Sequence, residues 1–168
     1  SATNPANLFA CGDMWQGIVN LGGDVFITEP CDDREPAIWD AETAISSTGG
    51  KVDLRYVQFN ENYIGVELKD GNFVYPIGIP IAIRAVDFNA SGGLISKEPH
   101  IGQQSHAHII LDNVSDIIIG DAPASNTGTF TNNFSKAEYG IRATNSKATI
   151  LNNAFTSINP TTNSPQNC

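Results

Sequence analysis

The chain has 168 residues, only 16% of them charged, and its 9 Lys and Arg against 18 Asp and Glu give a formal net charge of −9. This length fits one domain with a sizeable core. An anionic surface repels phosphate backbones and anionic lipids, and no apolar run approaches the ~18 residues of a membrane span. Nucleic-acid binding, membrane-surface binding and membrane insertion are therefore not expected.

After a lead-in over residues 1–14, short strand-like segments follow one another along the chain. The segments "KVDLRY", "IAIRAV" and "AHIILD" alternate apolar and polar residues, a period of two that is typical of strands with one buried face. The 15 Gly and the many Asn, Thr and Ser residues suit turn-rich β structure better than helices. The sequence therefore predicts an all-β chain.

A repeat connects these segments. Residues 38–45, 59–66 and 134–141 each begin with an apolar residue and end, after five further residues, with a small residue and a β-branched one. An aliphatic or Thr residue is followed five positions later by an apolar one at Leu54/Phe59, Ile83/Phe88, Ile109/Val114, Thr129/Phe134 and Ile150/Phe155. These pairs recur at intervals of roughly 20 residues or somewhat more, which is too short for a unit to bury its own apolar face. Neighbouring units must therefore stack.

Stacking would place equivalent residues above one another. We expect Phe59, Phe88, Phe134 and Phe155 to form an internal aromatic stack. The small residue of the repeat, such as Gly65, is expected at a tight corner. Roughly six or seven coils spaced about 4.8 Å apart would make a rod about 30 Å long.

The segments "WQGIVNLGGDVFI", "AIWDAETAISSTGGKVDLRYVQFNENYIGV" and "AEYGIRATNSKATILNNAFTSI" resemble right-handed parallel β-helix repeat proteins of the pectate-lyase-like superfold. The resemblance is greatest to repeat modules of secreted or surface-attached bacterial proteins, and it covers residues 15 to about 158. It implies a right-handed parallel β-helix, or β-solenoid, and a secreted or cell-surface location. It does not imply an activity, because the superfold hosts enzymes, adhesins and spacers alike.

One β-helix domain is expected over residues 15–158, between the lead-in and a C-terminal cap or linker tail at 159–168. Pro, Gly and charged residues interrupt the repeat in three segments that we expect to protrude as loops, at 28–36, 69–80 and 96–106.

Catalysis on a polysaccharide would need paired carboxylates, or a basic residue beside an acidic cluster. Arg55 and Arg84 occupy equivalent outward positions in the repeat, with Asp53 and Asp87 nearby, and could form such a catalytic face. The alternative is a solvated charge ladder on the outside of the rod.

Three side chains are candidates for binding a ligand. Trp39 follows the inward Ile38 and is expected to point outward, where an indole could stack on a sugar ring. His106 and His108 are expected on one outward strand face, about 7 Å apart, where they could bind sugar or a transition metal. The alternative is that both histidines are simply exposed polar residues.

Asp32, Asp33 and Glu35 could coordinate calcium, the one cofactor that the sequence suggests, and the alternative is a solvated acidic loop. Cys11 and Cys31 bracket the first strand-like segment, so a disulfide between them would suit an exported protein. The alternative is free thiols, with Cys168 at the end of the chain unpaired.

The expected function is that of a non-catalytic, exported β-helix module, a structural, adhesive or assembly-forming segment of a surface protein. Its open ends would associate with other domains or with other copies of the chain. The alternatives are a polysaccharide lyase or hydrolase, and a carbohydrate-binding module without turnover.

Overall fold

The computed structural model describes residues 6–28, 35–73, 83–90, 95–120 and 131–158. These residues form strands, turns and irregular segments, and no helix occurs among them, so the all-β prediction is confirmed for this part of the chain. Within the same ranges, the structure contains no helix of the length and apolar character needed to cross a membrane.

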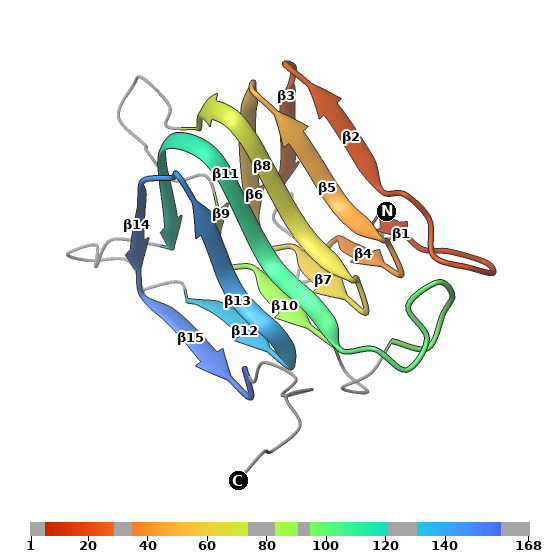
Figure 1. Ribbon diagram of the computed structural model, residues 1–168. Helices are drawn as coiled ribbons and strands as arrows, with labels where there is room; N and C mark the ends of the chain where they lie inside the picture. Colours follow the sequence, from red (N-terminus) through yellow and green to blue (C-terminus); the bar gives the residue numbers. More distant parts are fainter. Residues whose placement is uncertain (1–5, 29–34, 74–82, 91–94, 121–130, 159–168) are drawn as a thin grey trace, which may run out of the picture.

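The strands form two sheets in which every pairing is parallel (Figure 1). The six-stranded first sheet has the order β1 (Asn7–Leu8), β4 (Ala37–Trp39), β7 (Gln58–Asn60), β10 (Asp87–Asn89), β12 (Asn132–Ser135) and β15 (Asn153–Thr156). The nine-stranded second sheet has two branches that share β11 (Ser105–Gly120). The first branch adds β2 (Ile18–Leu21), β5 (Thr43–Thr48), β8 (Ile64–Asn72) and β13 (Ala137–Thr144). The second branch adds β3 (Asp24–Thr28), β6 (Lys51–Arg55), β9 (Ile83–Arg84) and β14 (Ala148–Leu151).

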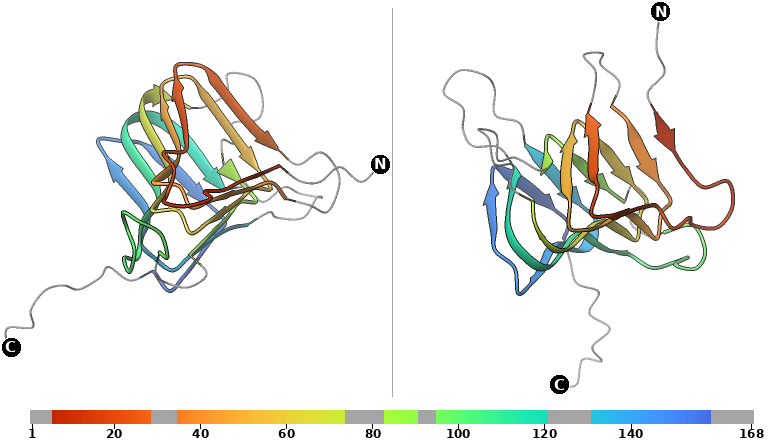
Figure 2. Two further views of the ribbon diagram at one scale, coloured as in Figure 1. Left: turned by 90° about the vertical axis from the view of Figure 1, so that its right-hand side faces the viewer. Right: turned by 90° about the horizontal axis from the view of Figure 1, so that it is seen from above.

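The chain passes through the first sheet, the first branch and the second branch in the same order each time. Strands β4, β5 and β6 are followed by β7, β8 and β9, and each strand pairs with its counterpart from the previous pass. The colours in Figure 1 therefore run from red to blue across both sheets, and Figure 2 shows the same succession from two other sides. This arrangement is compatible with the parallel β-helix expected from the sequence.

Pairing in register lines up similar residues of successive passes. One aliphatic row in the second branch consists of Ile27, Leu54, Ile83, Ile119 and Ile150. A second row, in the first branch, consists of Ile18, Ile45, Val66, Ile109 and Ile141. The three middle residues of both rows are fully buried. Since burial of one such side chain contributes roughly 1.5–3 kcal/mol, the core is built by stacking passes and not within any single pass.

The predicted aromatic stack is confirmed. Phe59, Phe88, Phe134 and Phe155 are register partners in the first sheet. Their successive ring centroids lie 4.8, 4.9 and 4.8 Å apart, at interplanar angles of 14°, 10° and 13°. These separations match the spacing of strands in a sheet. The backbone therefore sets the ring separation, and the outermost ring, Phe155, remains 48% exposed.

The predicted pair Ile109/Val114 is wrong as a copy of the repeat. Strand β11 continues through the point where other passes turn, and Val114 pairs with Gly71 in the first branch instead of joining the phenylalanines. The aliphatic position of this pass is filled by Ile119. The spacing of Ile109 and Val114 fitted the repeat because Val114 is apolar. It is also buried, but in the first branch of the second sheet.

The corner expected at Gly65 is also wrong. Left-handed backbone angles occur directly after first-sheet strands, at Asp40 (φ 57°), Glu61 (φ 55°), Lys136 (φ 59°) and Ser157 (φ 54°). Gly65 is small for a different reason, since an added Cβ would lie 3.0 Å from the Phe88 ring and 2.5 Å from the His108 carbonyl oxygen. The missing side chain makes room for the aromatic stack.

The predicted loops are described in part. Residues 69–72 belong to β8 and residues 105–106 to β11, so these ends of two predicted loops are wrong. Residues 95–104 lie outside the strands and turn back on themselves through hydrogen bonds between Ile95 and both Gly102 and Gln103. The segments 29–34 and 74–82 lie outside the described residues.

Phe88→Ala should destabilise the fold by about 3–5 kcal/mol, because it leaves a cavity between two buried rings. Phe155→Ala is the matched control. It should cost much less because, among the described residues, this ring stacks on Phe134 alone and is half exposed. Urea unfolding of both variants measures the difference. Equal losses would show that the stack does not carry the stability of the first sheet.

Candidate functional site

The outer face of the first sheet carries two rows of side chains beside the inward phenylalanines. One row consists of Trp39, Asn60, Asn89, Ser135 and Thr156. The other consists of Ala37, Gln58, Asp87, Asn133 and Ala154. Because strands alternate their side chains between two faces, both rows point away from the core. Two hollows lie on this face.

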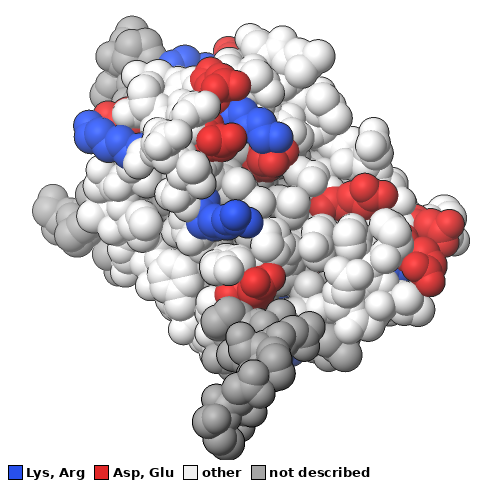
Figure 3. Space-filling view, viewed as in Figure 1, with Lys and Arg blue, Asp and Glu red and all other residues white. Residues whose placement is uncertain are grey.

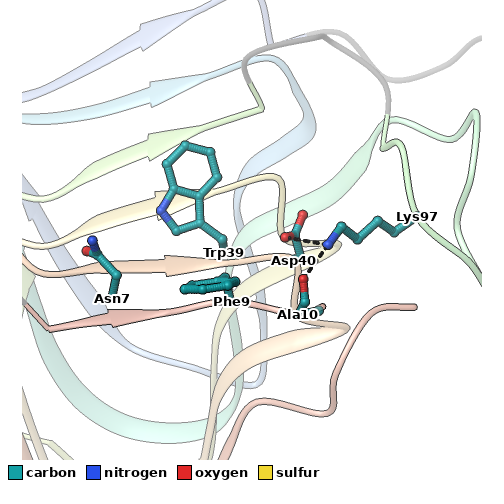
Figure 4. Close-up of a pocket in the computed structure, with 6 residues that line it drawn as sticks. All are labelled: Asn7, Phe9, Ala10, Trp39, Asp40 and Lys97. Atoms are coloured by element: carbon teal, nitrogen blue, oxygen red, sulfur yellow. Dashed lines mark hydrogen bonds and ion pairs between the residues drawn. The ribbon is translucent and has the colours of Figure 1, made fainter. Parts of the chain in front are cut away.

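The first hollow, here called the aromatic hollow, has a volume of about 410 Å³ and is lined by Asn7, Phe9, Ala10, Trp39, Asp40 and Lys97. Figure 4 shows the Trp39 indole above Phe9, with the Lys97 and Asp40 side chains meeting at one side. Phe9 is 63% exposed, whereas Trp39 is half-buried. The hollow thus combines flat apolar surface with one ion pair.

Segments far apart in the sequence hold the aromatic hollow together. Lys97, from the segment 95–104, forms an ion pair of 3.0 Å with Asp40 and donates a 2.6 Å hydrogen bond to the Ala10 carbonyl. Trp15 donates from its indole nitrogen to the Trp39 carbonyl at 2.7 Å. Trp15 also packs against the core. These contacts fix the backbone on both sides of Trp39.

The second hollow, here called the amide hollow, has a volume of about 420 Å³. Its lining is mainly amide and hydroxyl groups, and consists of Gln58, Asn60, Asp87, Phe88, Asn89, Asn133, Ser135 and Lys136. Asn133 donates to an Asp87 carboxylate oxygen at 2.6 Å, and the Ser135 hydroxyl donates to the Asn89 side-chain oxygen at 3.1 Å. Such a lining can exchange hydrogen bonds with hydroxyl groups of a ligand.

The four candidate catalytic residues are only partly brought together. Asp53 and Arg55 form a two-point ion pair in β6, with N–O distances of 2.7 and 2.6 Å. Arg84 is the register partner of Arg55 in the second branch. Asp87, in contrast, lies in the first sheet and lines the amide hollow.

Acidic and basic side chains are interspersed over the surface drawn in Figure 3. Some form ion pairs, such as Lys69 with Glu67 at 2.9 Å and Lys147 with Asp116 at 3.2 Å. Pairs as exposed as Lys147 and Asp116 contribute little to stability.

His106 lies on the surface of β11 and is held on both ring nitrogens. Its Nδ1 lies 2.8 Å from a Glu138 carboxylate oxygen, and Arg142 contacts its Nε2 at 3.1 Å. The ring also stacks against Tyr63, with centroids 5.7 Å apart. His106 is thus part of a polar and aromatic cluster on the first branch, on a different sheet from both hollows.

His108 is buried, so the expectation that it faces solvent is wrong. Ala107, His108 and Ile109 are buried in succession, which breaks the alternation on which that expectation rested. His108 occupies the register position of Gly65 and Gly140 in neighbouring passes. Its ring tilts toward Phe88 and Phe134, with centroids 5.5 and 6.1 Å away.

The environment of His108 disfavours its charged form. Burial lowers its pKa from 6.5 to about 4, and the opposing contribution of the hydrogen bond to the Ser135 carbonyl is smaller. That bond joins Nε2 to the carbonyl oxygen at 2.8 Å. The side chain is therefore a neutral donor that links β11 to the first sheet.

The calcium and disulfide predictions fall largely outside the described ranges. Asp32, Asp33, Cys31 and Cys168 lie there. Glu35 accepts a hydrogen bond of 2.9 Å from Gln58, and Cys11 carries an exposed thiol with no disulfide partner among the described residues. Within the same residues, no cluster of three His, Cys, Asp or Glu side chains could hold a metal ion.

Comparison with protein-family models gives no match, and neither the search of curated proteins nor that of solved structures finds a similar protein. The class that the fold defines is thus an all-β protein of parallel sheets, and the site must be interpreted from its own geometry.

Sequence reasoning singled out Trp39 but missed three residues around it. Phe9 precedes the first aligned repeat, and Lys97 reaches Trp39 only through a segment whose path no repeat predicts. Asn60 reads as a turn residue, yet it is 6% exposed and lines the amide hollow. The aligned repeats already place Asn60 at the position that Trp39 occupies in the previous repeat. This correspondence could have identified Asn60 as a candidate.

The free energy of unfolding should fall by about 2 kcal/mol between about pH 7.5 and pH 5 on account of His108. Its folded pKa of about 4 lies below the unfolded 6.5, so the unfolded chain takes up a proton first. The stabilisation is complete above pH 6.5 and is lost as the pH falls toward 4. Urea unfolding at both pH values measures it.

His108→Ala should remove this part of the pH dependence, since alanine occupies the equivalent position in β5, at Ala44. His106→Gln is the matched control and should retain it. An unchanged pH profile in His108→Ala would contradict the assignment.

Proposed function

We propose that the protein is a non-catalytic, exported module that attaches to carbohydrate through the aromatic hollow. The observation that carries the proposal is the pairing of Trp39 and Phe9 around an open hollow with the Lys97–Asp40 ion pair at its side. Aromatic faces provide apolar contact for the C–H face of a sugar ring, and a few placed polar groups select its orientation. An adhesive role needs this binding and no turnover.

The finer description of the fold belongs to the same proposal. We infer a right-handed parallel β-helix, in which the strands of the first sheet mark six successive coils. This number is at the lower end of the range that the sequence suggests. The sequence resemblance supports the handedness and a secreted or cell-surface location, and the wealth of surface amide and hydroxyl groups suits a surface module.

Trp39→Ala should weaken carbohydrate binding at least tenfold, because a central aromatic residue of an interface typically contributes more than 2 kcal/mol. A glycan array identifies the ligand, and titration calorimetry measures the affinity. Tyr139→Ala, which removes a partly exposed aromatic ring from the first branch, is the control and should leave binding unchanged.

Two results would count against this function. One is equal binding by Trp39→Ala and the unchanged protein. The other is the release of unsaturated products from pectin or alginate, with loss of that activity in Arg55→Ala or Arg84→Ala, which would establish the lyase alternative.

A second candidate function is assembly through the ends of the stack. Leu8 in β1 is 42% exposed, although it belongs to the inward row of the first sheet. At the other end Ile150 and Phe155 are 49% and 48% exposed, and they also belong to inward rows. Among the described residues the outermost strands also pair on one side only. Apolar ends with unpaired edges favour association with another domain or another copy.

Leu8→Lys and Ile150→Lys should each weaken self-association about tenfold or more, because either change places a charge in an apolar contact. Sedimentation velocity over a range of concentrations measures the association. Ile110→Lys is the control, since this half-buried residue lies on the outer side of β11 between the register positions of Glu67 and Arg142. A monomer at every concentration would exclude assembly between copies.

A further inference from the structure

The two hollows adjoin on one face of the first sheet. Trp39 of the aromatic hollow is the direct register partner of Asn60 in the amide hollow. We propose that an extended, uncharged oligosaccharide binds across both hollows, from Trp39 to Ser135, with Asn60 as a hydrogen-bond donor to it. The inference rests on the carbohydrate-binding function, and it adds the chemical class of the ligand and a second binding position.

Asn60 is the residue that points to a ligand. Its side chain is 6% exposed and lines the amide hollow, and its Nδ2 atom has no hydrogen-bond partner among the residues that the structure describes. A buried donor without an acceptor costs free energy, so proteins rarely retain one. An oxygen of a bound ligand would satisfy it.

Asn62, two residues further on, is a buried asparagine whose side chain does form hydrogen bonds within the protein. It is 4% exposed, and its side chain accepts from the Ala41 amide and donates to the Ile38 carbonyl, both at 2.9 Å. Its burial is thus fully compensated. Asn60 and Asn62 form a natural pair of buried amides, of which one is satisfied internally and the other is not.

The charges around the amide hollow favour a neutral ligand. Most of the lining presents uncharged donors and acceptors, and its two charged residues, Asp87 and Lys136, are of opposite sign. The chain as a whole carries a formal charge of −9. The hollow thus has no net charge in its lining, and a polyuronate would meet repulsion from the long-range field of the acidic chain.

The dimensions call for more than one sugar ring. Trp39, Asn60, Asn89 and Ser135 lie on four adjacent strands of the first sheet. Strands lie about 4.8 Å apart, so this row spans about 14 Å. A short oligosaccharide can therefore contact the indole and the amides at once, whereas a single sugar contacts one hollow.

The first test needs no knowledge of the ligand. Asn60→Leu should raise the urea concentration at the midpoint of unfolding, because it removes an uncompensated donor while keeping the volume. Asn62→Leu should lower it, because it leaves the Ala41 amide and the Ile38 carbonyl without their partners. A loss of stability in Asn60→Leu comparable with that in Asn62→Leu would overturn the proposal.

The second test measures binding by calorimetry to neutral tetrasaccharides of glucose, xylose, mannose or galactose, and to matched tetramers of galacturonate and mannuronate. At least one neutral tetramer should bind more tightly than its monosaccharide and than either acidic tetramer. Asn60→Leu should weaken that binding about tenfold, as expected for one lost hydrogen bond to a buried donor. Asn62→Leu should leave the affinity unchanged.

The results separate this inference from the function on which it rests. If Trp39→Ala abolishes binding and Asn60→Leu does not alter it, the aromatic hollow binds carbohydrate and the extended site is wrong. Preference for an acidic tetramer, or equal affinity for monosaccharide and tetrasaccharide, also overturns the inference. If no tetramer binds the unchanged protein, the extended site is wrong.

Discussion

Parallel pairing of each strand with its counterpart from the previous pass is the constraint on which the rest of the structure depends. Because the pairing is in register, a residue has above and below it the residues at the same position of the repeat. The rings of Phe59 and Phe88 therefore lie 4.8 Å apart, which is the distance between their strands. The same register aligns polar residues in rows on the outer face of the first sheet. The apolar core and the polar outer face of the first sheet thus both follow from one backbone periodicity.

Much of this fold could be predicted because apolar residues recur along the sequence once in each pass. The rows that contain Phe59 and Val66 follow from aligning short segments of the sequence. The prediction was wrong at Val114, since spacing alone cannot show that β11 continues through a corner. It was wrong again at His108, because three successive residues are buried there, and the alternation of residue types does not predict such a run.

The candidate site was harder to predict for a physical reason. Trp39 could be recognised because an aromatic residue at an outward position breaks the alternation of inward apolar and outward polar residues. Phe9 and Lys97 line the same hollow as Trp39 but come from segments that do not repeat. The periodicity of the sequence therefore does not predict their positions. Asn60 is marked as a candidate by the hydrogen bond that its Nδ2 atom lacks among the described residues. This absence can be recognised only in the structure, once the positions of the neighbouring residues are known.

The reach of Lys97 back to Ala10, across 87 residues, has a consequence for the order in which the protein matures. Phe9 and Trp39 leave the ribosome before Lys97, the lysine that completes their surroundings. Passes that pair only with their neighbours can begin to fold while the remainder of the chain is being made. The nascent chain would then expose its aromatic surface before that surface is fully shaped, and the aromatic hollow would be completed only after Lys97 has emerged.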